Sequence, residues 1–372
     1  MKVKRIEEEF FRLLNINSPS KNESPLAEYL YAYFVKMGLE VIQNASISGT
    51  KCNLLARLPA YQSQSSEAIL LSAHLDTIES TEGIQLIVSN GRISTNGSTI
   101  LGADDKSGIV IIQEIISTLI EEKLPHPPIE IALSTEEEIH LLGSKDFPIE
   151  KLHAKKGIVL DSDGDAGIIT HSAPSHFSFE ADIHGIPAHA GMEPEKGKSA
   201  ILLAAKIINQ LPMGRIDRET TSNIGIIKGG KASNIVAEDC FFNGEVRSRN
   251  EAKLEVISSY IASVFEKEKN LGAQIDFRSH KPYTAYHLDP DAPFIQALQK
   301  SARETGLTPT VIGSGGGSDA NIYNEKIPGM QCVVLSCGMM KAHTHQEYID
   351  LVNLDKTTAW LLQFLTNVAS GK

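Results

Sequence analysis

The chain has 372 residues, of which 41% are hydrophobic and 22% charged, and its formal net charge is -11. This length suggests two or three domains, and the composition is that of an ordinary globular protein. The negative charge disfavours nucleic acid and anionic membranes as partners, because both attract basic patches.

The N-terminal stretch MKVKRIEEEFFRLLNI mixes both charge signs and lacks the apolar run of a signal peptide. No segment approaches the roughly eighteen apolar residues of a membrane helix. The cysteines, at positions 52, 240, 332 and 337, lack paired short spacing and are expected to be reduced thiols. We therefore expect a cytoplasmic protein that does not bind membranes.

Helices and apolar strands alternate along the first half of the chain. The strand expected at 67–77 is too apolar to have a face in water, so we place it in the centre of a sheet, and the strand expected at 128–138 is also expected to be buried. Residues 84–95 are predicted to form a hairpin around an Asn-Gly turn. The expected helices are 3–16, 25–38 and 109–122, and the other expected strands are 39–46, 52–59 and 155–165.

The pattern changes near residue 174 and returns near residue 284. Between these points, half-exposed strands and helices follow one another in the order βαββαβ. A helix at 293–306, a Gly-rich loop, a buried strand at 330–338 and a last helix at 357–369 come afterwards. We predict an α/β fold in which residues 1–173 and 284–372 form a mixed-sheet domain with helices on both faces, and residues 174–283 form an inserted α+β domain.

Imidazole and carboxylate side chains follow the apolar segments. Ligands of open α/β sheets bind beyond the carboxyl ends of the strands, so these side chains should meet at one edge. Five apolar segments, including an expected strand at 98–101, are followed by such residues. They are His74 and Asp76; Asp104 and Asp105; Glu136, Glu137 and Glu138; Asp161 and Asp163; and His343, His345 and Glu347.

So many carboxylates in one cleft would repel one another unless a cation neutralised them. Two imidazoles with three or four carboxylates and no thiolate suit one or two divalent ions, with zinc first and manganese or cobalt as alternatives. Such ions commonly serve hydrolysis. Each motif alone has an ordinary explanation, such as a helix start or surface histidines, and DSDGD resembles a calcium loop without the distal glutamate of an EF-hand. Their shared position at strand ends favours the metal site.

The order of the motifs resembles the dinuclear zinc metallopeptidases that include peptidase T, carboxypeptidase G, aminoacylases and succinyl-diaminopimelate desuccinylase, with peptidase T-like proteins nearest. The matching stretches span nearly the whole chain: SAHLDT, GADDKSG, STEEEIHLLGS, LDSDGD, GIPAHAGMEPEKGKSAI, GGKASNIVAE, EVRS, GGGSDAN and AHTHQEYI. The resemblance implies that the mixed-sheet domain is a metal-binding catalytic domain. It also implies that the insert is a lid or dimerisation domain and that the protein is a homodimer.

The resemblance assigns roles to matching residues. The implied metal ligands are His74 and Asp163 for one ion, Glu138 and His343 for the other, and Asp104 for both, while Asp161 stays open as an alternative to Asp163. The family has a cis peptide bond after this aspartate, here between Asp104 and Asp105. Asp76 would orient the imidazole of His74. Glu137 would be the general base that takes a proton from water and passes it to the leaving amine.

Four further residues are assigned through the same resemblance. His189 in PAHAG matches the family histidine that stabilises the oxyanion, often across a dimer. Asn234 and Arg247 match positions that hold substrate or order the dimer, and a structural role is nearly as well supported. Gly316 belongs to GGGSDAN, whose glycines allow close approach to a substrate backbone; the alternative is a plain helix entry with Asp319 near the cap.

Two positions depart from the family. His140 stands where the family usually has glycine, two residues after the paired glutamates. Ser314 and Gly315 occupy the neighbourhood in which the tripeptidase has an arginine that would hold a substrate carboxylate. The second departure argues against strict tripeptide specificity.

We predict a homodimeric, two-metal hydrolase of amide bonds, foremost an aminopeptidase that releases N-terminal residues from short peptides. The alternative within hydrolases is a deacylase of N-acyl amino acids or a related small amide. A non-catalytic binding module on the same scaffold is disfavoured because the ligand positions and Glu137 are all present. A calcium-dependent structural protein is disfavoured by the histidines.

Overall fold

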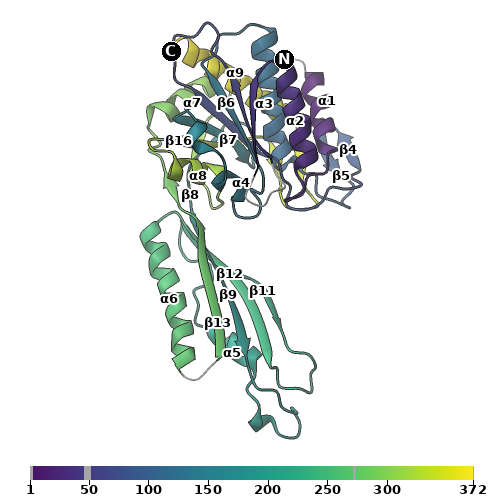
Figure 1. Cartoon of the computed structure of the whole chain (residues 1–372), viewed down its shortest axis with the longest axis vertical. Helices are drawn as coiled ribbons and strands as arrows, with labels where there is room; N and C mark the ends of the chain where they lie inside the picture. The colour runs from purple at the N-terminus through teal and green to yellow at the C-terminus, as the bar shows by residue number, and fades with distance from the viewer. Residues whose placement is uncertain (1–2, 46–51, 271–273, 372) are drawn as a thin grey trace. The chain divides into compact units, whose positions relative to one another are not determined.

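The computed structural model describes residues 3–45, 52–270 and 274–371. They form two compact units (Figure 1). The main unit comprises Met1–Ser172, His287–Ser314 and Ser318–Lys372, and the inserted unit comprises Ala173–Tyr286 with Gly315–Gly317. Each unit is described by itself.

A mixed sheet of nine strands forms the centre of the described part of the main unit. Its strands are β1 (Glu40–Ala45), β2 (Cys52–Leu58), β3 (Ile69–His74), β6 (Ile129–Ser134), β7 (Lys156–Ser162), β8 (Ile168–Ala173), β14 (Tyr286–His287), β15 (Thr310–Gly313) and β16 (Gln331–Ser336). The order is β1-β2-β6-β3-β7-β16-β8-β14, and β15 pairs with β8. Strands β6, β3, β7 and β16 run parallel, so their carboxyl ends lie at one edge of the sheet.

The strand predicted to be central, β3, is central, and the strand predicted to be buried, β6, is buried. Every residue of β3 and of β6 is buried, and both strands are flanked on each side in the sheet. Helices bury both faces of a parallel sheet. The sequences of these strands are therefore continuous apolar runs and do not alternate between apolar and polar residues.

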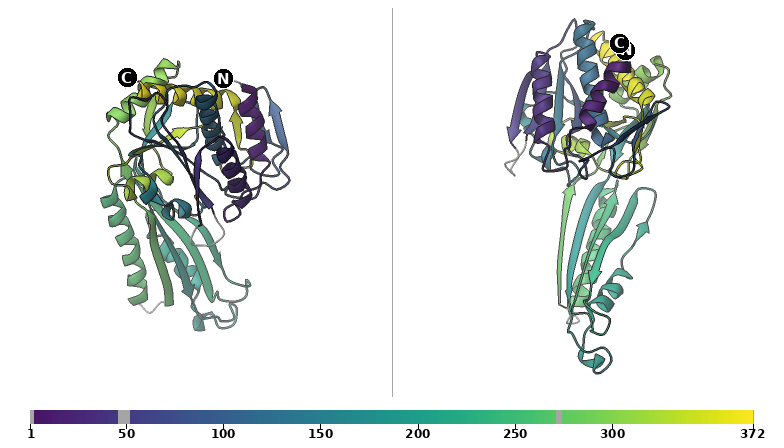
Figure 2. Two further views of the ribbon diagram at one scale, coloured as in Figure 1. Left: turned by 45° about the horizontal axis from the view of Figure 1, so that its top comes forward. Right: turned by 90° about the vertical axis from the view of Figure 1, so that its right-hand side faces the viewer.

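Helices cover the sheet on both sides (Figure 2). They are α1 (Val3–Leu14), α2 (Ser24–Lys36), α3 (Ala103–Glu121), α4 (Leu142–Lys145), α7 (Pro293–Glu304), α8 (Asp319–Lys326) and α9 (Leu351–Ala369), with a 3₁₀ turn at Ile149–Lys151. Helix α3 packs on β3 and β7 and is itself packed by α1 and α9, whereas α2 packs on β1 and β2. This arrangement confirms the predicted fold class.

A smaller sheet carries the predicted hairpin. It contains β17 (Met339–Met340), β18 (Tyr348–Asp350), β5 (Arg92–Thr95) and β4 (Leu86–Ser89), in that order. Asn90 and Gly91 have φ of 52° and 76°, as a two-residue turn of the primed type requires. The strand expected at 98–101 does not form. Side-chain oxygens of Thr95 and Asn96 instead accept the N–H groups of Gly97 and Ser98 and hold a turn.

The inserted unit is an antiparallel sheet packed on two helices. Its elements are β9 (Ser175–His184), α5 (Ala200–Ile208), β10 (Gly214–Arg215), β11 (Thr220–Gly229), β12 (Asp239–Ser248), α6 (Glu251–Asn270) and β13 (Gln274–Tyr283), with a 3₁₀ turn at Pro194–Lys196. The strand order is β10-β11-β12-β9-β13, and α5 and α6 pack against β9 and β12. This is the expected βαββαβ succession with the short β10 added.

The cysteines whose side chains the structure describes form no disulfide bonds. Cys240, Cys332 and Cys337 are free and buried, and the side chain of Cys52 lies outside the described residues. Among the described helices, none has the length and apolar character needed to cross a membrane.

Candidate metal centre

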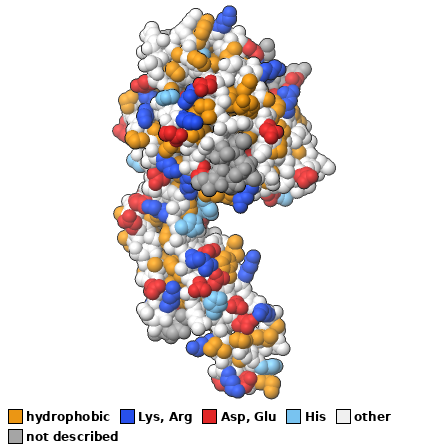
Figure 3. All heavy atoms as spheres, in the orientation of Figure 1, with side chains coloured by type: hydrophobic (Ala, Val, Ile, Leu, Met, Phe, Trp, Pro, Cys, Tyr) orange, Lys and Arg blue, Asp and Glu red, His pale blue; other side chains and the backbone are white. Residues whose placement is uncertain are grey.

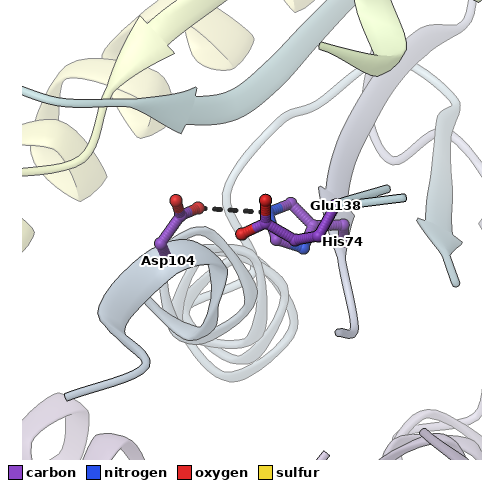
Figure 4. Close-up of side chains that lie close together, drawn as sticks. All are labelled: His74, Asp104 and Glu138. Carbon is purple, nitrogen blue, oxygen red and sulfur yellow. Dashed lines mark hydrogen bonds and ion pairs between the residues drawn. The ribbon is translucent and has the colours of Figure 1, made fainter. Parts of the chain in front are cut away.

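Asp104 lies between two imidazoles at the carboxyl edge of the main sheet. Its Oδ1 is 3.1 Å from Nε2 of His74, and its Oδ2 is 3.1 Å from Nε2 of His343. Oε1 of Glu138 is 2.9 Å from the same nitrogen of His343. Figure 4 shows His74, Asp104 and Glu138 pointing toward one another. Their ligand atoms all lie within 4.8 Å of one another. One carboxylate thus offers an oxygen to each histidine, the arrangement expected of a bridging ligand.

The backbone around Asp104 turns its side chain out of the helix. Asp104 has φ of -80° and ψ of 104°, which is not helical, although it stands at the start of α3. The peptide bond between Asp104 and Asp105 is cis, as the resemblance implied. Gly108 lets the helix begin here, because a Cβ at this position would lie 2.4 Å from the carbonyl oxygen of Leu160 and 2.5 Å from Oδ1 of Asp105.

A second group of possible ligands contains His74, Asp105 and Asp161. Nε2 of His74 is 3.8 Å from Oδ1 of Asp161, whose side chain is only 11% exposed. Asp163 is exposed and belongs to neither group among the described residues. The chain turns after β7, where Gly164 donates its N–H to Met339, and this turn carries Asp163 toward Ala342. The geometry therefore favours Asp161 over Asp163 and reverses the expected order.

The glutamate turn after β6 is held by Asp76. Oδ1 and Oδ2 of Asp76 accept the backbone N–H groups of Glu137 and Glu138, at 2.9 and 3.2 Å. Oδ1 also lies 3.4 Å from Nδ1 of His74, and Ser20 donates to Oδ2 at 2.7 Å. Asp76 therefore contacts a predicted ligand and the backbone of the predicted base, as expected of a residue that orients the ring.

His140, which stands where the family usually has glycine, adopts a backbone conformation typical of glycine. His140 has φ of 74°, in the left-handed region that glycine adopts without strain. Glu136 and Leu141 lie in the same region, at φ of 52° and 59°. The turn therefore keeps the backbone that a family glycine would favour, while the side chain of His140 is exposed. The imidazole does not prevent this turn from forming.

The charges of the cluster call for a cation. Burial raises the pKa of Glu137, Asp105 and Asp161 well above the usual carboxyl range, and neighbouring carboxylates add to this. Burial also opposes ionisation of Asp104, but the imidazoles of His343 and His74 hold its pKa well below its usual range.

The pKa of the imidazole that faces these carboxylates changes in the opposite direction from that of Asp104. The carboxylates of Asp104 and Glu138 raise the pKa of His343 to about 10. Carboxylates outnumber imidazoles in the cluster, and divalent cations compensate such an excess. The donor atoms are imidazole nitrogens and carboxylate oxygens, with no thiolate in either described group, so they suit zinc and related ions.

Two of the remaining predicted residues, His189 and Asn234, lie on segments of the inserted unit that hydrogen-bond to each other. The N–H of Ala190, next to His189, donates to the carbonyl of Asn234 at 3.0 Å. Nδ1 of His189 accepts the N–H of Gly191 at 3.2 Å. The neutral ring therefore carries its proton on Nε2, which is left as a hydrogen-bond donor.

The other two lie elsewhere in that unit. Arg247, on β12, places Nε and Nη2 each 3.1 Å from the carboxylate of Glu245, which fits a structural role. Gly316 belongs to the short segment Gly315–Gly317, where a Cβ on Gly317 would lie 2.5 Å from the ring of Tyr283. The Gly-rich loop also leads into a helix, as the alternative interpretation of this loop expected, and Ser318 caps the N-terminus of α8.

Two buried carboxylates of the cluster, to which the resemblance gave no individual role, bind backbone N–H groups. Oδ2 of Asp105 accepts the backbone N–H of His74 at 3.1 Å. The carboxylate of Glu347 accepts the N–H groups of Gly102 and Asp104, at 2.7 and 3.1 Å. Both residues stood among the acidic residues after the apolar segments, but spacing cannot show that a carboxylate binds backbone far along the chain.

Comparison with known proteins agrees with this geometry. Residues 70–367 match the model of peptidase family M20/M25/M40. The protein YqjE of Bacillus subtilis (strain 168) is 34% identical over 98% of this chain and 99% of its own. The crystal structure of aminopeptidase PepT from Bacillus cereus has a TM-score of 0.88 at 35% identity and covers 99% of both chains. That of a tripeptidase from Staphylococcus aureus has a TM-score of 0.92 at 31% identity, covering 100% of this chain and 99% of its own.

Proposed function

The chain belongs to peptidase family M20/M25/M40 and is a metal-dependent peptidase, and on this basis we propose that it is an aminopeptidase that removes N-terminal residues from short peptides. The observation that carries the proposal is the carboxylate of Asp104 between His74 and His343. The similarity of the whole chain to structures described as an aminopeptidase and a tripeptidase supports it. Ser314 and Gly315, in place of an arginine, favour peptides of more than one length.

Two divalent ions fit the cluster, with zinc as the first candidate and cobalt or manganese as alternatives. We assign His74, Asp104 and Asp161 to one ion, with Asp105 as a further candidate beside His74 and Asp161, and Asp104, Glu138 and His343 to the other. When bound, such ions lower the pKa of a water molecule and polarise the scissile carbonyl.

Glu137 serves as the general base in this proposal. It is 9% exposed, its backbone N–H donates to Asp76, and the charges of His74 and Glu138 act on its carboxyl group. Burial raises its pKa, which suits a group that takes a proton from water and later gives it to the leaving amine.

The resemblance adds residues of the inserted unit to this proposal. The Nε2 donor of His189 would stabilise the oxyanion, and Asn234 fixes the loop on which His189 stands. Arg247 and Gly316 remain weaker candidates for substrate contact. Kinetics of a His189 variant separate an oxyanion role from a scaffold role. Loss of an oxyanion donor lowers kcat without altering the metal content of the protein.

We also propose a homodimer formed through the inserted unit. Beyond the short β10, which pairs at Gly214 and Arg215, the outer edge of β11 has no strand partner among the described residues. Ile226 and Ile227 on this strand are 46% and 55% exposed, and Leu202 on α5 is 73% exposed. Figure 3 shows exposed hydrophobic side chains on this unit. An open edge with apolar side chains favours pairing with a second copy. The free thiols of the described residues fit the cytoplasmic location that we propose with it.

A substrate panel tests the proposed function. The protein, loaded with zinc, cobalt or manganese, is incubated with di-, tri- and tetrapeptides beside N-acetyl amino acids. We expect release of N-terminal residues from the peptides, loss of that activity on chelation, and recovery when metal returns. Preferential hydrolysis of N-acetyl amino acids would identify a deacylase instead, and full activity in a metal-free preparation would contradict the two-metal assignment.

A further inference from the structure

Buried carboxylates tie together the separate segments that carry the cluster. Asp76 follows β3 and binds the backbone of Glu137 and Glu138, after β6. Asp105 follows the loop before α3 and binds the backbone N–H of His74, at the end of β3. Each of these carboxylates reaches from one segment to the backbone of another, so the ligands are positioned by their neighbours.

Glu347 forms the corresponding link for the last segment. It lies four positions after His343, and its side chain is buried, at 1% exposure. Oε2 accepts the N–H of Gly102 at 2.7 Å, and Oε1 accepts the N–H of Asp104 at 3.1 Å. Both carboxylate oxygens are thus engaged by the loop that carries the bridging aspartate.

We propose that Glu347 is a positioning residue of the metal centre, which couples the segment of His343 to the backbone of Asp104. The inference rests on the proposed two-metal site and adds a residue to it. Because Glu347 fixes the backbone on which Asp104 stands, it sets the separation between the bridging carboxylate and the imidazole of His343. Residues that orient ligands in this way typically change metal affinity or activity by about 10- to 100-fold when they are replaced.

The hydrogen-bonding pattern makes a conservative substitution informative. A carboxylate can accept both N–H groups, whereas the amide of glutamine offers one acceptor oxygen and one NH₂ donor. Glu347→Gln therefore keeps the volume of the side chain but sets an NH₂ group against one backbone N–H. The Asp104 loop should then move away from its position relative to His343.

The test is zinc binding to the chelator-treated protein, measured by calorimetry for the natural chain, Glu347→Gln and Gln346→Ala. Gln346 is a matched control, because it neighbours Glu347 but is exposed and its side chain contacts the Nζ of Lys341 at 2.9 Å. We expect Glu347→Gln to weaken zinc binding by about 10- to 100-fold, and Gln346→Ala to leave it unchanged. Binding does not require peptide hydrolysis, so this result is independent of whether the proposed substrate is correct.

Two further readouts distinguish positioning from general damage to the fold. At low zinc, kcat of Glu347→Gln should fall with little change in KM, and added zinc should restore much of the lost activity. Thermal unfolding of the metal-free variant should remain cooperative. Unchanged zinc affinity in a folded Glu347→Gln protein would overturn the proposal, and so would a loss of activity that excess zinc does not restore. If the glutamine variant does not fold, Glu347→Asp, which is too short to reach both N–H groups, replaces it in the same comparison.

Discussion

Oδ1 of Asp76 accepts the backbone N–H of Glu137 at 2.9 Å. The same oxygen lies 3.4 Å from Nδ1 of His74, whose other ring nitrogen faces Asp104. One buried carboxylate therefore fixes the orientation of a metal ligand and the backbone of the proposed base. This linkage ties the backbone of the proposed base to His74, which would hold one of the ions, and a general base must lie within hydrogen-bonding reach of the proton that it takes.

Glu137→Gln should abolish turnover while leaving metal binding intact. The amide cannot take a proton from water, so kcat should fall by at least about 100-fold. Glu137 is not among the ligand groups around His74, so elemental analysis should still find about two ions per chain, as a two-metal site requires. Activity at the natural level would show that another group is the base.

Asp161→Asn and Asp163→Asn form a matched pair that decides between the two aspartates. Asp161 approaches His74 to 3.8 Å, while Asp163 lies in neither ligand group. We expect Asp161→Asn to weaken zinc binding at least about tenfold, and Asp163→Asn to have a smaller effect in the same calorimetric titration. The opposite ranking would restore Asp163 as the ligand.

Ile227→Lys should convert a dimer into monomers. A charged side chain on an open strand edge disfavours pairing with another strand, and Ile227 is 55% exposed on β11. Val256→Lys, on α6 and 70% exposed, is the control with the same change away from that edge. Sedimentation velocity should give monomers for the first variant and dimers for the second. A monomeric natural chain, or two equally affected variants, would exclude β11 as the interface.

Glu245 makes the stability of the inserted unit depend on pH. His176, 3.1 Å away, and Arg247 lower the pKa of Glu245 from 4.5 to about 2. A carboxyl group with a lowered folded-state pKa adds stability above its unfolded pKa, and this stability is lost as the pH falls from about 4.5 to about 2.

The measurement is urea unfolding of the natural chain and Glu245→Gln at pH 7 and pH 3. The variant should be less stable at pH 7, and the difference should shrink at pH 3. Glu255→Gln on the exposed side of α6 is the control and should show no such dependence. A difference that stays constant or grows toward pH 3 would show that the contacts of the Glu245 carboxylate with His176 and Arg247 do not stabilise the fold.

Much of the fold was predictable because periodicity and turn chemistry act locally. The uniform burial of β3 and the Asn90-Gly91 turn follow directly from their residues. The strand expected at 98–101 failed because Thr95 and Asn96 hydrogen-bond to the backbone of Gly97 and Ser98. Side-chain hydrogen bonds to nearby backbone groups can thus prevent a strand from forming, although the apolar pattern of the sequence still predicts one.

Sequence reasoning predicted which side chains would meet in the candidate site, but not the groups that hold them in place. Strand ends of a parallel sheet meet at one edge, which brought His74 and Glu138 together with Asp104 as expected. The structure favours Asp161 over Asp163, because the chain turns at Gly164, and spacing along the sequence does not reveal such a turn. Glu347 was unpredictable as a supporting residue, since its partners Gly102 and Asp104 are distant in sequence.

The most direct test is anomalous diffraction from crystals of the zinc-loaded protein. Two zinc peaks are predicted, one on each side of Asp104, with Oδ1 and Oδ2 each bound to one of them, and with His74 and His343 on different ions. A single peak, or two peaks of which Asp104 binds at most one, would contradict the bridging role on which the proposed chemistry depends.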